Sequence, residues 1–532
     1  MYSTPKRLAC VACLLGAGTL MAETPRQGLS ADFSHGAIKV SSDGRHLVHA
    51  DGTPFFYLGC TAWDILYAWT REQVDVYLEN RRQRGFTAIQ GGTVGYIGDW
   101  DRQNKYGNKP FIGEDISKPN EPFWVHVDYI VAKAYEKGIM FAFWPGWGGH
   151  MGSEDNAKLT AYGKFLAQRY GNKPNFIFVM GGDCGEAWSS PVVAKAIKSV
   201  APNILCSYHP VGPSRSEYFR NESWYDFAGF QSGHGQRNYD LSYVYVSQDY
   251  ALNPPKPTLD FEPRYEGHGS YVDNSIHFDE YDVRQAGYWS VFAGAAGQAY
   301  GCMGIWNSYW STFPEGLDRP GAWDMGHVRA VVESRPMLSR KPDQSLILSG
   351  SGSGADHMQA CMSTGCALIY FSTGQTASIA TNKIGASRVK AWWYDCREGT
   401  AQFIDEADAA SSRTFDPPGT QGRGNDWVLV LDDASKSFPL PGQGGPIDTD
   451  GATISHGIVP KAGISSAWIR ADNLVVNEAG MTAVSVVNAR GQVVVSERFV
   501  GLHHVSLARL MPGVYQVSIR TAQRVQSVSV VR

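Results

Sequence analysis

The sequence has no block of basic residues and no second long hydrophobic run. Its 47 lysines and arginines face 51 aspartates and glutamates, for a net charge of -4 and a pI near 6.4. Nucleic acids and anionic membranes are bound through clustered lysine and arginine, which this chain does not have. After residue 22, no stretch approaches the roughly 20 apolar residues that a membrane-spanning helix requires. We therefore expect no nucleic-acid partner and no membrane span.

The first residues carry the pattern of a secretory signal peptide. Lys6 and Arg7 precede an apolar stretch from Leu8 to Ala22, and polar residues follow it. Such a stretch is too short and wrongly flanked for a membrane span. We assign residues 1–22 to a signal peptide and expect an exported protein that is periplasmic, bound to the cell surface or extracellular.

Motifs for metal and cofactor chemistry are also missing. The seven cysteines beyond residue 22 include no CxxC pair, and the chain has no HExxH pair, phosphate-binding glycine loop or nucleophile elbow. We therefore expect no catalytic metal and no cofactor. Cys361 and Cys366 flank a turn-like segment and can bridge a hairpin in an oxidising compartment.

Eight short apolar runs alternate with helical patterns between about residues 51 and 335. Thr70 can cap one such helix, whose apolar face is Val74, Tyr77 and Leu78. Apolar strands separated by helices indicate a parallel sheet covered on both faces, and eight of them predict a closed (β/α)8 TIM barrel over residues 23–337. The runs are residues 55–60, 86–91, 139–144, 176–181, 204–209, 227–232, 257–262 and 297–306.

The composition changes after the predicted barrel. Residues 338–435 show alternating strands between Gly, Ser and Pro turns, which is typical of a small β-sandwich. Residues 436–463 are rich in Gly and Pro and are predicted to be a linker. Residues 464–532 alternate again, which predicts a C-terminal all-β module of Ig-like type.

Two carboxylates fall at the ends of opposite predicted strands. Asp183 follows the glycines of "VMGGD", and Glu262 ends the seventh run in "TLDFE". A TIM barrel places its active site at the carboxyl ends of its strands. In glycoside hydrolysis, one carboxyl group protonates the leaving oxygen while a second attacks or activates water. We predict Asp183 and Glu262 as the catalytic pair of a glycoside hydrolase acting on a polysaccharide or oligosaccharide.

Other interpretations of these two acids are open. Asp183 can be the N-cap of the following helix, and Glu262 can form an ion pair with Arg264. Asp260 and Glu186 are the reserve candidates. The gap between the acids, and with it a retaining or inverting mechanism, is not given by the sequence. A non-catalytic carbohydrate- or matrix-binding protein on a degenerate barrel and a metal-dependent barrel hydrolase are the competing functions.

Further side chains at or near predicted strand ends are candidate sugar contacts. The chain has 16 tryptophans and 26 tyrosines, and aromatic rings either stack on sugars or fill cores. Each candidate can equally pack beneath the site. They are Trp63, Gln90, Trp144, Trp147, His209, Gln231, His234, Arg264, Tyr265 and Trp306.

A set of ordered motifs resembles one known family over roughly residues 45–435. They include "DGTPFFYLGCTAWDI", "VMGGD", "FQSGH", "LDFEPRYEGH" and "YDVRQAGYWSVFAGAAGQAYG", followed by "KAWWYDCREG" and "NDWVLVLDD". They resemble the apiosidase-like glycoside hydrolases, whose barrel is followed by a small domain labelled collagen-binding. The resemblance implies an acid/base role for Asp183 and a nucleophile role for Glu262. It also implies activity, for some members, on apiose linked to galacturonic acid in the plant pectin rhamnogalacturonan II.

Two positions depart from that family. Cys60 interrupts the motif that commonly reads "GDTAW", and Cys302 stands where a histidine commonly follows "YG". Strands one and eight are neighbours in a closed barrel, so we hypothesise a disulfide between these cysteines at the mouth. Loss of a polar pair there leaves the apiose specificity open.

The C-terminal tail carries a second resemblance. Its "LMPGVYQVSI" segment is similar to the C-terminal sorting modules of type IX secretion, which implies a secretion machinery as partner. An Ig-like carbohydrate-associated module is the alternative.

Overall fold

The computed structural model describes residues 29–92, 94–95, 100–237, 240–307, 315–444, 467–470, 473–488, 493–506, 514–520 and 525–531. Contacts divide the chain into a larger unit, Pro25–Ser455, and a smaller unit that includes His456–Arg532. The predicted signal peptide and residues 445–463 of the predicted linker lie outside the described residues.

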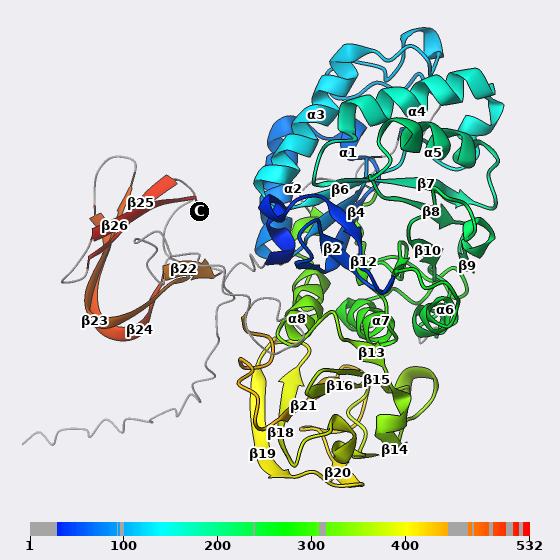
Figure 1. Ribbon diagram of the computed structural model, residues 1–532. Coiled ribbons are helices and arrows are strands. Elements are labelled where there is room, and N and C mark those ends of the chain that lie inside the picture. Colours follow the sequence, from blue (N-terminus) through cyan, green and yellow to red (C-terminus); the bar gives the residue numbers. More distant parts are fainter. Residues whose placement is uncertain are drawn as a thin grey trace, which may run out of the picture. The chain divides into compact units, whose positions relative to one another are not determined.

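Each of the eight apolar runs contains a strand, as predicted (Figure 1). Six of these strands form a parallel half-barrel sheet in the order β12-β4-β5-β6-β7-β8, and the other two, β10 and β11, pair in parallel in a second sheet. The backbone N–H of Asp226 donates to Cys206 O (2.9 Å) and that of Ala296 to Thr258 O (3.0 Å), so single hydrogen bonds link the two sheets. The described strands form a mixed α/β fold without one continuous eight-strand ladder. The bounds are β4 (Tyr57–Ala62), β5 (Ala88–Gly91), β6 (Met140–Phe143), β7 (Phe176–Cys184), β8 (Cys206–Pro210), β10 (Ala228–Gln231), β11 (Thr258–Asp260) and β12 (Gly297–Tyr300).

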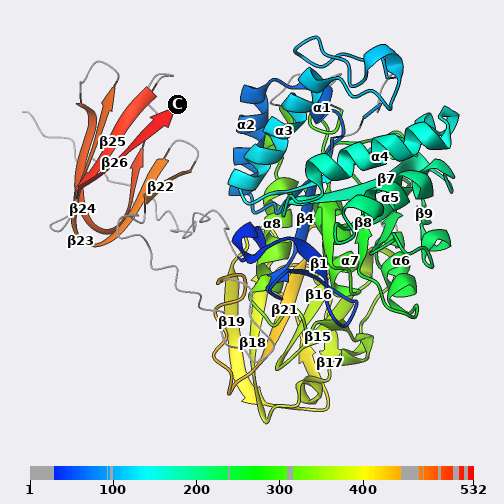
Figure 2. The same cartoon turned by 45° about the horizontal axis from the view of Figure 1, so that its top comes forward.

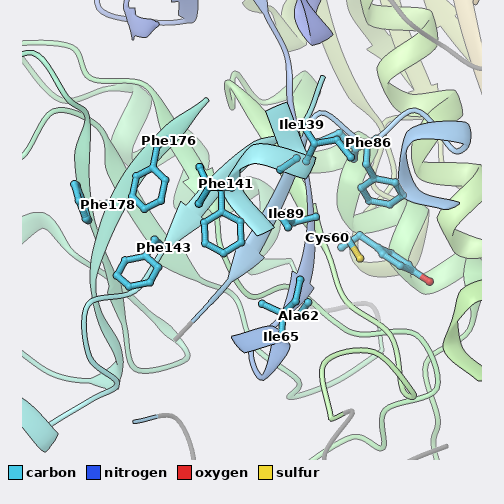
Figure 3. Packing of buried hydrophobic residues seen from close by; sticks show 14 of the residues in the cluster. Cys60, Ala62, Ile65, Phe86, Ile89, Ile139, Phe141, Phe143, Phe176 and Phe178 are labelled. Atoms are coloured by element: carbon cyan, nitrogen blue, oxygen red, sulfur yellow. The ribbon is translucent and has the colours of Figure 1, made fainter. Parts of the chain in front are cut away.

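Residues on the two faces of the parallel sheet alternate between two cores. Phe141 and Phe143 of β6 pack with Phe176 and Phe178 of β7 in one cluster (Figure 3). Their neighbours along the chain, such as Met140, belong to a second cluster, which also contains three of the four candidate tryptophans, Trp63, Trp144 and Trp147. Side chains of a strand point alternately to opposite faces, so both faces of these strands are buried.

Helices alternate with the strands (Figures 1 and 2). The predicted cap is present: Thr70 accepts a hydrogen bond from the Gln73 N–H and forms a capping box with that residue. No helix in the described part of the chain has the length and apolar composition to cross a membrane. The bounds are α1 (Ile65–Ala68), α2 (Arg71–Gln83), α3 (Glu121–Glu136), α4 (Asn156–Tyr170), α5 (Ser189–Val200), α6 (Leu241–Tyr250), α7 (Glu280–Phe292) and α8 (Gly321–Glu333).

One short sheet and one additional strand accompany the parallel strands. The first, β1 (Ile38–Val40), β2 (Leu47–His49) and β3 (Pro54–Phe55), is antiparallel and precedes β4. The strand β9 (Ser214–Arg215) pairs antiparallel with β10 and forms the edge of the second sheet.

Residues 341–433 form two antiparallel sheets. Leu368 and Tyr370 belong to the same core as the phenylalanines of β6 and β7, whereas Ile369 and Phe371 belong to a separate core between the two sheets. The larger sheet has the order β13-β15-β16-β21-β18-β19, and the smaller has the order β14-β17-β20. Their bounds are β13 (Lys341–Pro342), β14 (Ile347–Ser349), β15 (Gln359–Ser363), β16 (Cys366–Phe371), β17 (Ala377–Ile379), β18 (Arg388–Asp395), β19 (Ala401–Asp408), β20 (Arg413–Phe415) and β21 (Trp427–Asp433).

Buried ion pairs join the larger of these sheets to the parallel-strand domain. Arg284 of α7 contacts Asp426 at 2.7 Å and Asp324 of α8 at 2.9 Å. Arg335, just after α8, contacts Asp432 of β21 at 2.7 Å. Removing one partner of a buried ion pair leaves an uncompensated charge, so these contacts hold the two parts in one arrangement.

The smaller unit contains one antiparallel sheet. Its strand order is β22-β23-β25-β26, and β24 also pairs with β23. Val484 and Val486 of β23 are buried. The bounds are β22 (Ala467–Arg470), β23 (Asn473–Asn488), β24 (Val493–Ser506), β25 (Val514–Arg520) and β26 (Val525–Val531).

The seven cysteines of the described residues are all free thiols, so both predicted disulfides are wrong. Cys60 is opposite Tyr300 in the β4–β12 register, and the Cys302 thiol donates to a backbone carbonyl, that of Gly316, at 3.4 Å. Both cysteines lie in the phenylalanine-rich core rather than at the mouth. In the hairpin, Cys361 is opposite Leu368 and Cys366 is opposite Ser363, so the two thiols do not face each other.

Candidate active site

Strand β7 ends in a bulge that presents Asp183. Its register with β8 shifts between Gly181 and Cys184. Gly181 and Gly182 have φ angles of +83° and +107°, and a Cβ on Gly182 would lie 2.5 Å from the ring of Trp147. Asp183 itself has a φ of +46° and an exposed side chain. Only glycine fits the close approach at position 182, and the bulge turns the following carboxylate to the mouth.

The alternative role of Asp183 as a helix cap is wrong. Helix α5 begins at Ser189, and its N-cap position is Trp188. The reserve candidate Glu186 is exposed on the loop between Asp183 and this helix.

Glu262 lies just beyond β11 and is buried between two histidines. Its side chain is 6% exposed. His234 Nε2 lies 3.0 Å from Glu262 Oε1, and His209 Nε2 lies 3.5 Å from Glu262 Oε2. The backbone of Glu262 is also fixed, because its carbonyl accepts from Gly233 N–H at 2.9 Å.

Asp260 and Arg264 lie two residues before and two residues after Glu262, and both make contacts away from the pair formed by Asp183 and Glu262. Asp260 accepts hydrogen bonds from Ser232 N–H (3.2 Å), Ser232 Oγ (2.6 Å) and Glu262 N–H (3.2 Å), so it anchors the ends of β10 and β11. Arg264 donates to Gln285 of α7 at 3.4 Å, and its described ion pairs do not include Glu262. The predicted ion pair between Arg264 and Glu262 is therefore not formed.

The two predicted catalytic acids come together. One oxygen of Asp183, one oxygen of Glu262 and one ring nitrogen of His209 all lie within 4.8 Å of one another. Carboxyl groups about 5–5.5 Å apart are typical of retaining glycosidases, and inverting enzymes need about 6.5–9.5 Å. The same three side chains have the donor types and spacing to hold a divalent transition-metal ion.

Loss of water around the site sets its electrostatics, although Asp183 keeps contact with solvent at the mouth. Loss of water, and then the charge of Glu262, raises the pKa of Asp183 to about 7, and burial raises the pKa of Glu262 to about 8. Burial also lowers the pKa of His209 to about 3 and that of His234 to about 4, so both imidazoles are neutral. At neutral pH the two carboxyl groups together hold about one proton. His234 Nε2 lies 3.0 Å from Glu262 Oε1: in the tautomer with its proton on Nε2 the imidazole donates to an ionised Glu262, and in the other tautomer it accepts from a protonated one.

Three tryptophans surround His209. Trp63 stacks on its ring with centroids 5.6 Å apart and an interplanar angle of 19°. Trp144 and Trp147 approach the same ring edge-on at 6.0 and 5.7 Å. All four side chains are at most 9% exposed. The group therefore forms a rigid aromatic wall behind the carboxylates.

The remaining predicted contacts lie at different depths. Gln90 is buried: its Nε2 donates to Thr61 Oγ1 (2.9 Å) and to Phe261 O, and its Oε1 accepts from Tyr57, so it supports the floor next to Glu262. The Gln231 amide lies next to Asp183 and His209. Tyr265 lies against His234, with ring centroids 4.6 Å apart, and Trp306 lies 6.1 Å from Tyr265, so both are on the His234 side of Glu262.

An aromatic group on that side includes residues that sequence reasoning missed. His234 stacks on His268 with centroids 4.4 Å apart, and Tyr265 lies 4.6 Å from His234. His268 also contacts Trp306 at 5.5 Å and Tyr271 at 5.2 Å. The signal for His268 and Tyr271 was the short "GHGSY" segment soon after the seventh strand.

Comparisons with known proteins relate the chain to glycoside hydrolases. Residues 41–339 match the family described as "Apiosidase-like, catalytic domain", and residues 341–432 match "Putative collagen-binding domain of a collagenase". A solved structure titled "Glycoside hydrolase" is 31% identical with a TM-score of 0.71, over 76% of this chain and 99% of that chain. A family 5 glycoside hydrolase from Bacteroides vulgatus is 28% identical with a TM-score of 0.73, over 78% of this chain and 97% of that one. No curated protein sequence matches the chain.

These similarities favour an enzyme over the alternative of a non-catalytic binding protein. The first family match covers more than half of the chain and contains both Asp183 and Glu262. The chain therefore belongs to the apiosidase-like family and is a glycoside hydrolase.

Proposed function

We propose that this glycoside hydrolase retains the anomeric configuration, with Glu262 as nucleophile and Asp183 as acid and then base. The observation that carries this proposal is the separation of the two carboxylate oxygens, within 4.8 Å. Carboxyl groups with oxygens this close fit the separation of about 5–5.5 Å in retaining enzymes better than the roughly 6.5–9.5 Å of inverting ones.

In the first step, Asp183 donates its proton to the glycosidic oxygen while Glu262 attacks the anomeric carbon. The bond to the leaving alcohol breaks, and an ester forms between the sugar and Glu262. In the second step, ionised Asp183 takes a proton from water, and the resulting oxygen attacks the anomeric carbon and releases Glu262. The raised pKa of Asp183, about 7, lets this group act as an acid near neutral pH.

The substrate that we propose is an apiose-containing side chain of a plant pectin, as in rhamnogalacturonan II. The apiosidase-like match supports this choice. The family departures at Cys60 and Cys302 do not count against it, because both side chains are fully buried in the core that packs away from the carboxylates.

The organisation that we propose for the whole chain is a closed barrel over residues 23–337, a β-sandwich over 338–435 and a C-terminal module over 464–532. The backbone hydrogen bonds that link the two parallel sheets support the closure. We further propose that residues 1–22 direct export and that the C-terminal sheet serves sorting through a secretion machinery or carbohydrate association. The Lys6–Arg7 start and the apolar stretch after it support export.

The test uses the mature protein and rhamnogalacturonan II oligosaccharides, with the anomer of the first product followed by proton NMR. We expect retention, and an inverted first product would contradict the mechanism. Asp183→Ala and Glu262→Ala should each lose turnover, while Glu186→Ala, a change in the same loop as Asp183, should keep it.

The products formed with azide distinguish the acid/base role of Asp183 from the nucleophile role of Glu262. In Asp183→Ala, azide replaces water in the second step and yields a glycosyl azide of retained configuration. In Glu262→Ala, azide takes the place of the missing nucleophile and yields the inverted azide. Exchange of these two outcomes would reverse our assignment of the residues.

A further inference from the structure

The loop that follows Glu262 exposes two apolar side chains at its tip. Tyr271 is 73% exposed and Val272 is 65% exposed, although most aromatic side chains of the larger unit are buried. Exposed aromatic rings beside a carbohydrate site are candidates for stacking on sugars, whose C–H faces are apolar.

This loop is held in place by hydrogen bonds. The backbone N–H of Tyr271 donates to His234 O at 2.9 Å, and Ser270 Oγ donates to Gly235 O. The N–H groups of Val272 and Asp273 donate to Ser270 Oγ at 3.1 and 3.2 Å. The ring of Tyr271 is therefore positioned in advance, so that binding does not have to order it.

The ring lies next to the catalytic machinery. Its centroid is 5.6 Å from that of His234 at an angle of 74° and 5.2 Å from that of His268 at 89°, so both imidazoles approach it nearly perpendicular. His234 in turn contacts Glu262 at 3.0 Å. Burial, and then the charges of Glu262 and Asp183, raise the pKa of Tyr271, which is consistent with its position beside the pair.

We propose that Tyr271 is a sugar-binding platform, on whose open face the sugar unit next to the cleaved one stacks. Only the imidazole ring of His234 separates Tyr271 from Glu262. The cleaved sugar then lies between the two carboxylates, and the neighbouring sugar unit lies over Tyr271. The enzyme then selects oligosaccharides over single glycosides. This inference rests on the proposed function, because it takes Asp183 and Glu262 as the point of cleavage.

The experiment compares two substrates. A rhamnogalacturonan II oligosaccharide offers a neighbouring sugar, whereas apiosyl fluoride has none. We expect Tyr271→Ala to raise KM for the oligosaccharide by about three- to tenfold, the range that corresponds to an aromatic stacking contact, and to leave kcat/KM for apiosyl fluoride unchanged. Tyr271→Phe should restore the wild-type KM, because the ring remains.

The matched control is Val272→Ala, which removes an equally exposed apolar side chain of the same loop. An equal rise of KM for Tyr271→Ala and Val272→Ala would overturn the inference, as would equal effects of Tyr271→Ala on both substrates. A wild-type protein that cleaves neither substrate would instead refute the proposed apiose specificity, so the two failures are distinguishable.

Discussion

Replacement of Glu262 by glutamine should abolish turnover and at the same time stabilise the protein. Burial raises the pKa of this carboxyl group from 4.5 to about 8. Each pKa unit corresponds to about 1.4 kcal/mol, so an ionised Glu262 lowers the free energy of unfolding by up to about 5 kcal/mol. Glutamine has the same shape without the charge, and its Oε1 can still accept the hydrogen bond from His234.

The sign of the effect depends on pH. Below the unfolded pKa of 4.5, the carboxyl group is protonated in both states and costs nothing. Because the folded pKa is raised, stability is lost progressively as pH rises from about 4.5 to about 8. The stabilisation by Glu262→Gln should therefore be close to zero at pH 4 and reach its maximum at pH 9.

Thermal unfolding measures this difference. A unit of about 430 residues has an unfolding entropy of about 0.9 kcal/mol/K, so the upper limit corresponds to a rise in Tm of about 5 °C at pH 9. The control is Glu186→Gln, which removes an exposed carboxylate from the neighbouring loop. A gain in Tm for Glu262→Gln that is the same at pH 4 and pH 9 would refute the reasoning.

Four other predictions follow from the site and its supports. Initial rates should show kcat/KM falling as pH rises past about 8, because the pair of Asp183 and Glu262 then loses the proton that the leaving group needs. Steady-state assays of Gly182→Ala should show at least a tenfold loss of kcat, since the new Cβ displaces the bulge that carries Asp183. Urea unfolding of Arg284→Met should show a loss of about 3–5 kcal/mol, because two buried carboxylates lose their partner. A chelator should leave the rate unchanged while added Zn²⁺ inhibits competitively, because the ion would bridge both carboxylates, and activity lost to the chelator would instead indicate the metal-dependent mechanism.

The strands were predictable because nearly continuous apolar residues indicate a strand that is buried on both faces. Residues 139–144 and 176–181 contain almost only apolar side chains; β6 lies within the first run, and β7 begins with the second and extends to Cys184. The capping box at Thr70 was predictable because its signal is local. The break in the ladder between β8 and β10 was not predictable, since strand pairing depends on backbone geometry rather than on side-chain pattern.

The predicted disulfide between Cys60 and Cys302 was wrong because of the direction in which the two side chains point. Cys60 lies on β4 and Cys302 just beyond the neighbouring strand β12, but each is buried in the core that packs away from the mouth. Position along a strand decides which face a side chain occupies, and a shift of one residue reverses it. The expectation that the first and eighth strands are neighbours in the sheet therefore could not establish a disulfide at the mouth.

Asp183 and Glu262 could be predicted as a pair because strand ends converge, and the histidines that contact Glu262 come from strands between them. His209 lies on β8 and His234 just beyond β10, so both contacts depend on how strands of two different sheets are placed. Asp260 illustrates the same limit, because its spacing of two from Glu262 suggested a second acid on the same face. Its three accepted hydrogen bonds instead tie Ser232 to the Glu262 backbone. Those bonds fix the end of β10 against the end of β11, and that arrangement determines the 3.0 Å contact between His234 and Glu262. Asp260 therefore positions the histidine that contacts Glu262.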